Sequence, residues 1–257
     1  MNNLFIVIPT RLNSRRLPNK VLKKINGKSL MQHVWESLKY FSNVYIATDN
    51  HQIIKEANKL QANVILTTEE PTNGTERCNE FAKKLKLSSK DILINVQCDE
   101  LNIKREWIEK IYMELSNSKD EIIVTVSTNL GKQTTHFWKK YHQDPSNVQV
   151  FLNENNFAKN FKRPSSKIFE NFSFQNPNQK ENLKINHHIG IYGYKVGTLS
   201  KISKLKITDR EKNEKLEQIR WVENNYKIKC ITTKDMHFGF SINTKEDLER
   251  LKRQNIL

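Results

Sequence analysis

A basic loop follows the first apolar run of the chain, residues 4–8. Four basic side chains come within this loop: Arg11, Arg15, Arg16 and Lys20. A guanidinium offers phosphate oxygens a planar set of donors, and a lysine ammonium adds a compact positive charge. Ser14 and the backbone N–H groups of the loop supply further donors. Because the glycines of the Walker and dinucleotide-binding motifs are missing, the loop predicts phosphate binding of another kind, with a solvated basic loop as the alternative.

Two carboxylates, Asp99 and Glu100, come directly after an apolar run within residues 91–96. In an open parallel sheet, ligands bind beyond the carboxyl ends of the strands. A carboxylate at such a position is suited to hold a divalent cation that bridges phosphate oxygens. The alternative is an acid that caps the next helix.

A third candidate segment, residues 73–77, reads Asn-Gly-Thr-Glu-Arg. Gly74 allows a close approach of the backbone, and Thr75 is suited to cap a helix. Arg77 would fall in the first turn of that helix, where a cation opposes the helix dipole. We therefore expect Arg77 to serve a purpose other than helix stability.

The elements that must position these segments alternate along the first half of the chain. Continuous apolar runs predict buried strands, and apolar residues at helical spacing predict amphipathic helices. The predicted strands are residues 4–8, 44–47, 63–66, 91–96 and 121–126, and the predicted helices are 29–41, 51–60, 75–87 and 107–115. This alternation indicates βαβ units and a mainly parallel sheet.

The second half of the chain has a different pattern. Residues 148–151 and 157–161 alternate as short antiparallel strands do, and residues 163–184 are polar and rich in turn formers, which predicts a loop. The remaining predicted elements are strands at 188–192 and 227–232 and helices at 211–224 and 244–254. The last helix has Asn243 or Thr244 as its cap, and Asp247 follows Thr244 by three positions, close to a capping box.

These patterns together predict the fold class. We expect one α/β domain over residues 1–257, with a mainly parallel sheet and helices on both of its faces. An antiparallel subregion inserted at about residues 130–200 is suited to a subunit interface. No internal repeat is present in the sequence.

Composition restricts the class of protein. The chain has 257 residues, enough to bury a core, and its apolar runs argue against disorder although only 37% of residues are hydrophobic. No apolar run approaches the about 20 residues of a membrane helix, and the first nine residues lack the basic region of a secretory signal. The three cysteines form no CxxC pair, which disfavours zinc and disulfides. We expect a cytoplasmic protein without membrane insertion.

The net charge of +15 arises from 43 basic and 28 acidic residues. Such a surplus is typical of nucleic-acid binders. Lysine is, however, spread along the chain together with many asparagines, and no block of five like charges occurs. We therefore expect a solvated basic surface that suits an anionic small substrate, and no nucleic-acid partner.

Taken in order, these segments resemble the 3-deoxy-D-manno-octulosonate (Kdo) cytidylyltransferases, over nearly the whole chain. The first-loop pattern Arg-x-x-Ser-x-Arg-Leu-Pro-x-Lys runs from Arg11 to Lys20, and residues 74–77 and 95–100 match the family's GTER and NVQGDE. Further matches lie at residues 25–36, 47–49, 144–150, 188–192, 216–220, 223–229 and 244–250. Each motif alone is weak, but the ordered set is specific.

The resemblance implies a Rossmann-like nucleotidyltransferase fold and the reaction CTP + Kdo → CMP-Kdo + pyrophosphate. The anomeric hydroxyl of the sugar attacks the α-phosphate in line and pyrophosphate leaves, so catalysis is mostly positioning and charge neutralisation. The family further implies Mg²⁺ as cofactor, a homodimer in the cytoplasm, and a place in lipopolysaccharide biosynthesis.

The resemblance also assigns roles to residues of this chain. The implied catalytic residues are Arg11, Lys20 and Asp99, and the implied metal ligands are Asp99 and Asn243. The implied nucleotide-binding residues are Arg11, Ser14, Lys20, Thr75, Arg77 and Gln97. The implied sugar-binding residues are Gln97, Arg163, His188, Tyr192, Glu217 and Gln218. Without the resemblance, His188 would be interpreted as a core histidine and Glu217 as an exposed helix acid.

The chain departs from the family pattern at several positions. Asn243 stands where the family's GVDT motif has a metal-binding Asp; an amide oxygen can bind a hard cation but brings no charge, so Mg²⁺ should bind more weakly. Cys98 replaces a Gly where the backbone approaches the nucleotide, and Leu101 replaces a Pro. Arg15 replaces a Thr and adds positive charge, and Asn19 replaces a Gly while tolerating a left-handed backbone.

Two alternatives follow from these departures. One is a cytidylyltransferase for a relative of Kdo, such as its 8-amino derivative, or for another nonulosonic acid. The other is a catalytically weak homologue that binds nucleotide or a partner for regulation. The retained residues favour an active enzyme: Arg11, Lys20, Asp99, His188, Glu217 and Gln218.

Overall fold

The computed structural model describes residues 1, 3–12, 17–130, 135–144, 146–164, 184–234, 242 and 244–254. The chain forms two compact units. The first unit comprises Met1–Asp120, Gly190–Lys204 and Gly239–Leu257, and the second comprises Glu121–Ile189 and Leu205–Phe238. Most of the loop predicted at residues 163–184 lies outside the described residues.

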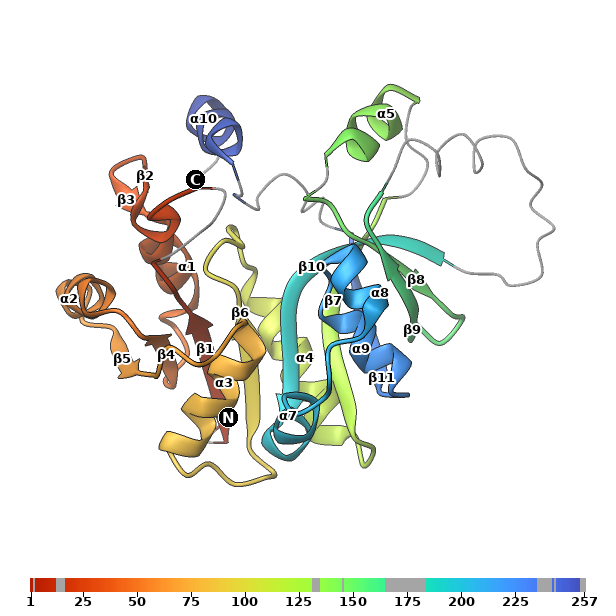
Figure 1. The fold of residues 1–257 in the computed structure, drawn as a ribbon, viewed down its shortest axis with the longest axis horizontal. Coiled ribbons are helices and arrows are strands. Elements are labelled where there is room, and N and C mark those ends of the chain that lie inside the picture. The colour runs from red at the N-terminus through yellow and green to blue at the C-terminus, as the bar shows by residue number, and fades with distance from the viewer. Residues whose placement is uncertain are drawn as a thin grey trace. The chain divides into compact units, whose positions relative to one another are not determined.

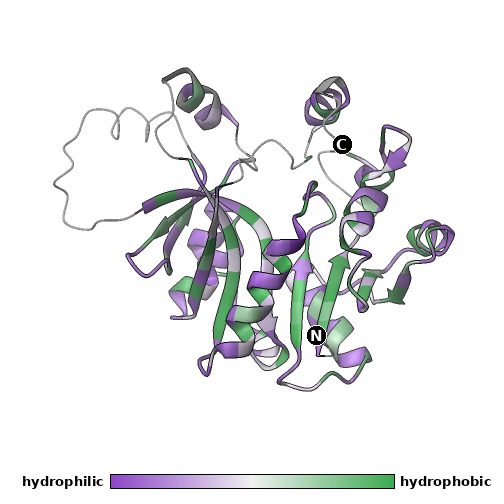
Figure 2. Cartoon of the chain, turned by 180° about the vertical axis from the view of Figure 1, so that it is seen from behind, coloured by the Kyte–Doolittle hydropathy of each residue, from purple (hydrophilic) through white to green (hydrophobic). Residues whose placement is uncertain are grey.

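The first unit is built on four parallel strands, in the spatial order β6–β1–β4–β5 (Figure 1). These are β1 (Leu4–Pro9), β4 (Val44–Thr48), β5 (Asn63–Leu66) and β6 (Ile92–Val96). Ile191–Lys195 of β10 (Lys184–Lys195) continue the sheet antiparallel to β6. The strands at the centre of this sheet are hydrophobic (Figure 2), and the apolar runs of β1 and β6 are buried except for Phe5, as the sequence predicts. The mainly parallel sheet is thereby confirmed.

Helices cover both faces of this sheet. The helices of the unit are α1 (Leu30–Leu38), α2 (His51–Lys59), α3 (Gly74–Lys84), α4 (Arg105–Asn117), α7 (Val196–Ile202) and α10 (Lys245–Gln254). Tyr45 of β4 contacts Phe81 of α3, so α3 lies on the face of Tyr45. On the opposite face, Gly193 of β10 lies directly against Ile111 of α4. Residues paired in register on adjacent strands point to the same face of a sheet, and successive residues of one strand point to opposite faces. The strand registers therefore place α3 and α4 on opposite faces.

The second unit combines parallel and antiparallel pairs. β7 (Ile122–Asn129) runs parallel to β11 (Lys227–Thr233). β8 (Gln149–Leu152) lies antiparallel to β9 (Ala158–Lys162) and to the first residues of β10. The unit's helices are α5 (Thr135–Gln143), α8 (Asp209–Glu214) and α9 (Gln218–Glu223). Antiparallel strands thus occur in the predicted subregion 130–200, whose role as an interface stays a prediction.

Two local predictions are wrong. The single helix predicted at residues 211–224 is two short helices, α8 and α9, because Lys215 adopts a left-handed backbone with φ of 54°. The cap of α3 is Asn73, whose side chain accepts a hydrogen bond from the backbone N–H of Glu76, and not Thr75. The capping box of α10 is confirmed, since Thr244 and Asp247 each donate a backbone N–H to the other's side chain.

Several small elements were not predicted: the helices α5 and α7 and the hairpin of β2 (Lys24–Ile25) and β3 (Lys28–Ser29). A short 3₁₀ helix, η1 (Lys20–Leu22), precedes the hairpin. Among the described residues, no helix has the length and apolar character needed to cross a membrane.

Candidate active site

The carboxyl ends of β1 and β6 bring two oppositely charged side chains together. Lys20 begins η1, after the loop that follows β1, and Asp99 follows β6. Because β1 and β6 are neighbours in the sheet, Lys20 Nζ and Asp99 Oδ2 lie 2.6 Å apart. The Lys20 side chain is 12% exposed and that of Asp99 is 27% exposed. Both are therefore partly buried, where charge interacts strongly, yet within reach of a solute.

Asn19, the residue before Lys20, adopts a backbone conformation that asparagine tolerates. Asn19 has φ of 54°, in the left-handed region, which confirms that it takes the conformation expected for the Gly of the family pattern. Ser14, Arg15 and Arg16 of the same loop lie outside the described residues. Their binding of phosphate stays a prediction.

Ile242, three residues ahead of α10, lies next to Asp99. The backbone N–H of Ile242 donates to the carbonyl oxygen of Asp99 at 3.3 Å. Asn243, the next residue, lies outside the described residues. Glu100 accepts a hydrogen bond from the backbone N–H of Gly190 at 3.3 Å, so this carboxylate is occupied in joining β6 to β10.

The carboxylate at the end of β6 suits a metal ion that binds together with the substrate. The described residues contain no cluster of three or more His, Cys, Asp or Glu side chains that would hold a metal alone. Mg²⁺ is commonly bound by one or two carboxylates together with substrate phosphates. Asp99 supplies one carboxylate at a strand end, which matches that mode.

The amide of Gln97 is held by its surroundings. Its Nε2 donates to Oδ1 of Asn95, a buried residue of β6, at 3.0 Å. Gly74, the first residue of α3, lies close enough that a Cβ there would come within 2.5 Å of Gln97 Nε2. The absence of a side chain at Gly74 therefore lets α3 begin directly against Gln97. Thr75, the next residue of α3, is buried.

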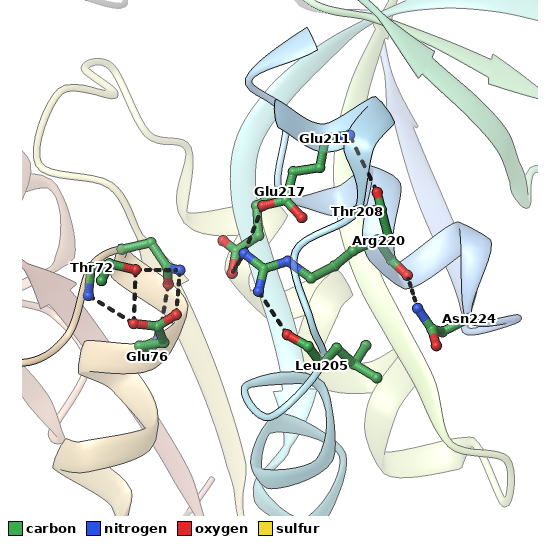
Figure 3. Close-up of polar contacts among 9 residues, drawn as sticks. Thr72, Glu76, Leu205, Thr208, Glu211, Glu217, Arg220 and Asn224 are labelled. Atoms are coloured by element: carbon green, nitrogen blue, oxygen red, sulfur yellow. Dashed lines mark hydrogen bonds and ion pairs between the residues drawn. The ribbon is translucent and has the colours of Figure 1, made fainter. Parts of the chain in front are cut away.

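Arg11, in the loop after β1, contacts the loop that leads into α3. It is exposed, and its guanidinium donates to the carbonyl oxygen of Thr72 at 3.4 Å. Thr72 in turn donates its backbone N–H and its hydroxyl to Glu76, at 2.7 and 3.0 Å (Figure 3). The carboxylate of Glu76 thus orders the loop that Arg11 contacts.

Arg77 is buried and its guanidinium makes several contacts. It lies 2.6 Å from Asp49 Oδ2, at the end of β4, and it also donates to the Thr67 hydroxyl and to the Thr68 carbonyl oxygen. This confirms that Arg77 has a purpose other than helix stability, since it joins α3 to the ends of β4 and β5. These contacts favour a supporting role, and direct contact of Arg77 with a nucleotide stays a prediction.

The thiol of Cys98 is a buried group beside the Lys20–Asp99 pair. Burial raises the pKa of Cys98 to about 12, so the thiol stays protonated at neutral pH. A protonated thiol is a poor nucleophile and a poor metal ligand. The extra side chain at this position therefore changes packing rather than adding a reactive group.

In the second unit, His188 of β10 is buried and neutral. Its Nε2 lies 3.1 Å from the hydroxyl oxygen of Thr125, and its ring meets the ring of Phe161 edge-on at 5.3 Å between centroids. Burial, with a smaller effect of His187, lowers the pKa of His188 to about 3. The ring can therefore exchange hydrogen bonds with a ligand but carries no charge at neutral pH.

Three other predicted residues lie at the turn between α8 and α9 or contact it. Arg163 donates to the carbonyl oxygens of Glu214 and Lys215, at 3.0 and 3.3 Å. Glu217 is the N-cap of α9, and its side chain accepts no capping hydrogen bond. Gln218 is buried at the start of α9. In the first unit, Tyr192 of β10 is buried, stacks on Tyr194, and is in register with Asn95 of β6.

The comparisons with known proteins agree with this arrangement. The sequence profile described as cytidylyltransferase matches residues 5–228. The chain belongs to the cytidylyltransferase family. A 3-deoxy-manno-octulosonate cytidylyltransferase of Francisella tularensis subsp. novicida (strain U112) is 37% identical over 258 residues, which covers 98% of each chain. The protein of that name from Fusobacterium nucleatum subsp. nucleatum is 32% identical over 256 residues and 97% of each chain.

Solved structures share the fold of this chain. The structure of a CMP:2-keto-3-deoxy-manno-octonic acid synthetase in complex with CTP matches 98% of both chains with a TM-score of 0.80 and 27% identity. A putative glucose-1-phosphate thymidylyltransferase from Bacillus anthracis matches with a TM-score of 0.64 and 15% identity, which indicates a shared fold alone. The Rossmann-like nucleotidyltransferase fold that the resemblance implied is therefore confirmed for this cytidylyltransferase.

The structure of this cytidylyltransferase brings many of the predicted residues together within each unit. In the first unit, a strand-end cluster contains Lys20, Gln97 and Asp99, and α3 contributes Thr75 and Arg77. In the second unit, Glu217 and Gln218 lie where α9 begins, and Arg163, which follows β9, contacts the turn that precedes them.

Sequence reasoning missed residues that support this site. Asn95 was visible as a polar residue inside an apolar run, which is a signal for a buried hydrogen bond. Asp49 and Arg220 lie inside segments that match the family. The partner of Asp49, Arg77, is 28 positions away, and Arg220 contacts Leu205 and Glu211 across the turns that flank α8. Only the folded chain reveals those contacts.

Proposed function

We propose that this chain transfers CMP from CTP to the anomeric hydroxyl of Kdo, or of a closely related 3-deoxy-ulosonic acid. The anomeric hydroxyl loses its proton to the solvent, the bond between its oxygen and the α-phosphorus forms, the bond from that phosphorus to the bridging β-phosphate oxygen breaks, and pyrophosphate leaves. The observation that carries the proposal is the Lys20–Asp99 pair at the carboxyl ends of β1 and β6. It stands in a chain whose full-length relatives bear the name of this activity.

Lys20 and Arg11 are the groups that we assign to the triphosphate. The ammonium of Lys20 is partly buried, so its charge acts on a phosphate oxygen with less screening than an exposed lysine would. Negative charge grows on the pyrophosphate as it leaves, and a fixed cation stabilises that charge in the transition state. Gln97, held by Asn95 and Gly74, is assigned to orient the nucleotide and the sugar, and Thr75 and Arg77 lie at the proposed cytidine pocket.

Mg²⁺ is the proposed cofactor, with the Asp99 carboxylate and the Asn243 amide oxygen as its protein ligands. When bound, the cation would neutralise charge on the phosphate oxygens. In its absence, the ammonium of Lys20 lies 2.6 Å from Asp99 Oδ2 and restricts the orientation of this carboxylate. A single carboxylate gives a weak site for the cation alone, so binding should depend on the nucleotide.

The sugar acid is assigned to His188, Tyr192, Glu217, Gln218 and Gln97. A neutral His188 can form a hydrogen bond with a hydroxyl, and a partly exposed Glu217 can accept one. Arg163 was the residue expected at the sugar carboxylate. Its contacts with the Glu214 and Lys215 carbonyls favour a role in holding the turn.

The assembly that we propose is a homodimer in which residues 1–257 act as one cytidylyltransferase domain. The antiparallel strands within residues 130–200 are the proposed interface. Light scattering on the purified chain tests this part directly: a dimer is expected, and a monomer at micromolar concentration with full turnover would contradict it.

The decisive experiment is pyrophosphate release with CTP and Mg²⁺, with Kdo, 8-amino-Kdo and sialic acid as acceptors and Mn²⁺ in parallel. Turnover with Kdo or its 8-amino derivative is the expected result, and omission of CTP is the control. Turnover with sialic acid alone would establish a different acceptor. Binding of CTP without turnover on any acceptor would contradict the proposal and favour a regulatory nucleotide-binding protein.

A further inference from the structure

Arg220 joins three parts of the second unit. Its guanidinium donates to the Leu205 carbonyl oxygen at 3.1 Å, ahead of α8, and lies 2.6 Å from Oε1 of Glu211 within α8. It also lies 3.8 Å from Oε1 of Glu217, the N-cap of α9 (Figure 3). The carbonyl oxygen of Arg220 accepts two hydrogen bonds from Asn224, so its backbone is fixed as well.

The arrangement places a charge deep in the unit. The side chain of Arg220 is 3% exposed and that of Glu211 is 10% exposed. Among the described residues, Nε of Arg220 and Oε2 of Glu211 have no hydrogen-bond partner. A buried ion pair of this kind adds little to stability compared with an apolar pair of the same volume. Stability therefore gives a weak reason for an arginine at this position.

Of the three charged residues Glu211, Glu217 and Arg220, Glu217 is the one that reaches the surface. Its side chain is 23% exposed, more than that of either other member. Its carboxylate does not cap α9. A separation of 3.8 Å from Arg220 is an ion pair without a short hydrogen bond. The buried cation thus attracts the carboxylate and restricts its orientation while leaving part of it exposed.

We propose that Arg220 is a positioning residue, which fixes Glu217 for the hydroxyl groups of the sugar acid. Glu211 is the counter-ion that anchors Arg220, so the two carboxylates have separate tasks. This inference rests on the proposed function, because it requires a sugar acid as the ligand of Glu217. It predicts that Arg220 acts on the sugar and not on the nucleotide.

The primary variant is Arg220→Lys. A lysine keeps the positive charge but has a single nitrogen, so it cannot contact Leu205 through one nitrogen and the two carboxylates through another as the planar guanidinium does. We expect the KM for Kdo to rise roughly tenfold or more, since small displacements of a positioning group have effects of this size or larger. The KM for CTP should stay unchanged. The matched control is Arg210→Lys, which alters an exposed arginine of α8 and should change neither KM.

A second variant covers the case in which Arg220→Lys does not fold. Glu211→Gln combined with Arg220→Met removes both buried charges together, so no uncompensated carboxylate stays in the interior. This double variant should unfold near the wild-type temperature and still show the raised KM for Kdo. A wild-type KM for Kdo in a folded double variant would overturn the proposal.

A double-mutant cycle separates positioning from a general structural effect. Glu217→Gln alone should raise the KM for Kdo, and adding Arg220→Lys to it should raise the KM little further. An equal effect of Arg220→Lys in both backgrounds would overturn the inference. An unchanged KM for Kdo in Glu217→Gln, when the wild type turns over Kdo, would also overturn the inference. That result would leave the proposed function intact. Absence of wild-type turnover with every acceptor would overturn the proposed function, and the inference with it.

Discussion

Lys20 and Asp99 are separated by 79 positions in the sequence, and their charged atoms lie 2.6 Å apart. The two segments meet because β1 and β6 are parallel neighbours, whose carboxyl ends adjoin. The pair neutralises two partly buried charges before any substrate is present. A triphosphate is negative and a divalent cation is positive, so Lys20 can pair with the triphosphate while Asp99 pairs with the cation. Neither side chain is then left as an isolated charge.

Replacement of Asp99 tests the acidic side of this pair. Asp99→Asn keeps the size and a carbonyl oxygen but removes the charge, so kcat should fall by about a hundredfold or more. Pyrophosphate release measures the effect. Asp91→Asn is the matched control, because Asp91 precedes β6 at the opposite end of the same strand and only caps a turn at Ser88. Near-normal kcat in Asp99→Asn would refute its assignment to the metal.

Lys20→Ala tests the basic side. Loss of a fixed cation should raise the KM for CTP or lower kcat by tenfold or more, because a partly buried ammonium interacts strongly with phosphate. Lys24→Ala, at an exposed lysine of β2, should leave both constants unchanged. Kinetics equal to the wild type in Lys20→Ala would remove this residue from the site.

Gly74→Ala tests the packing of α3 against Gln97. The added Cβ would lie 2.5 Å from Gln97 Nε2, so the amide must move and its bond to Asn95 must lengthen. Turnover should fall at least severalfold, with a small change in thermal unfolding temperature. Gly27→Ala is not a suitable control, because Gly27 has φ of 81° and is strained by any side chain. Gln97→Ala serves instead: if Gly74 acts through Gln97, combining the two changes should have little added effect, and full additivity would contradict this.

The strands and most helices of the first unit could be predicted because their patterns are local. Continuous apolar runs such as residues 4–8 are typical of buried parallel strands, and the strand-end rule located Asp99. The break between α8 and α9 was not predictable, since Lys215 takes a left-handed backbone that lysine rarely adopts.

The supporting contacts of the site could not be predicted, because they join distant segments. The pair of Arg77 with Asp49 spans 28 positions, and the bond of Arg163 to Glu214 spans 51. No periodicity encodes such distances. The resemblance to a family supplied names for Arg163 and Arg77, but the partners that hold them depend on tertiary packing.

Asn243→Asp tests the departure in the metal site. The preceding residue, Ile242, donates its backbone N–H to the Asp99 carbonyl oxygen, and the proposed function assigns position 243 to the metal together with Asp99. A second charged ligand should lower the Mg²⁺ concentration for half-maximal turnover severalfold. Titration of Mg²⁺ at saturating CTP measures it, with Asn153→Asp in the β8–β9 turn as the control. An unchanged midpoint would mean that position 243 does not contact the metal.

The buried His188 makes stability depend on pH. Its pKa of about 3 in the folded chain lies below the unfolded value of about 6.5, so the unfolded state binds the extra proton and stability falls as pH drops below 6.5. Between pH 7.5 and 5.5 this group should lower the free energy of unfolding by roughly 1 kcal/mol. Urea unfolding of the wild type and of His188→Gln measures the difference. The variant should lose this part of the pH dependence, whereas His51→Gln, at an exposed histidine of α2, should retain it. Identical pH dependence in the wild type and His188→Gln would show that His188 is not held neutral in the folded chain.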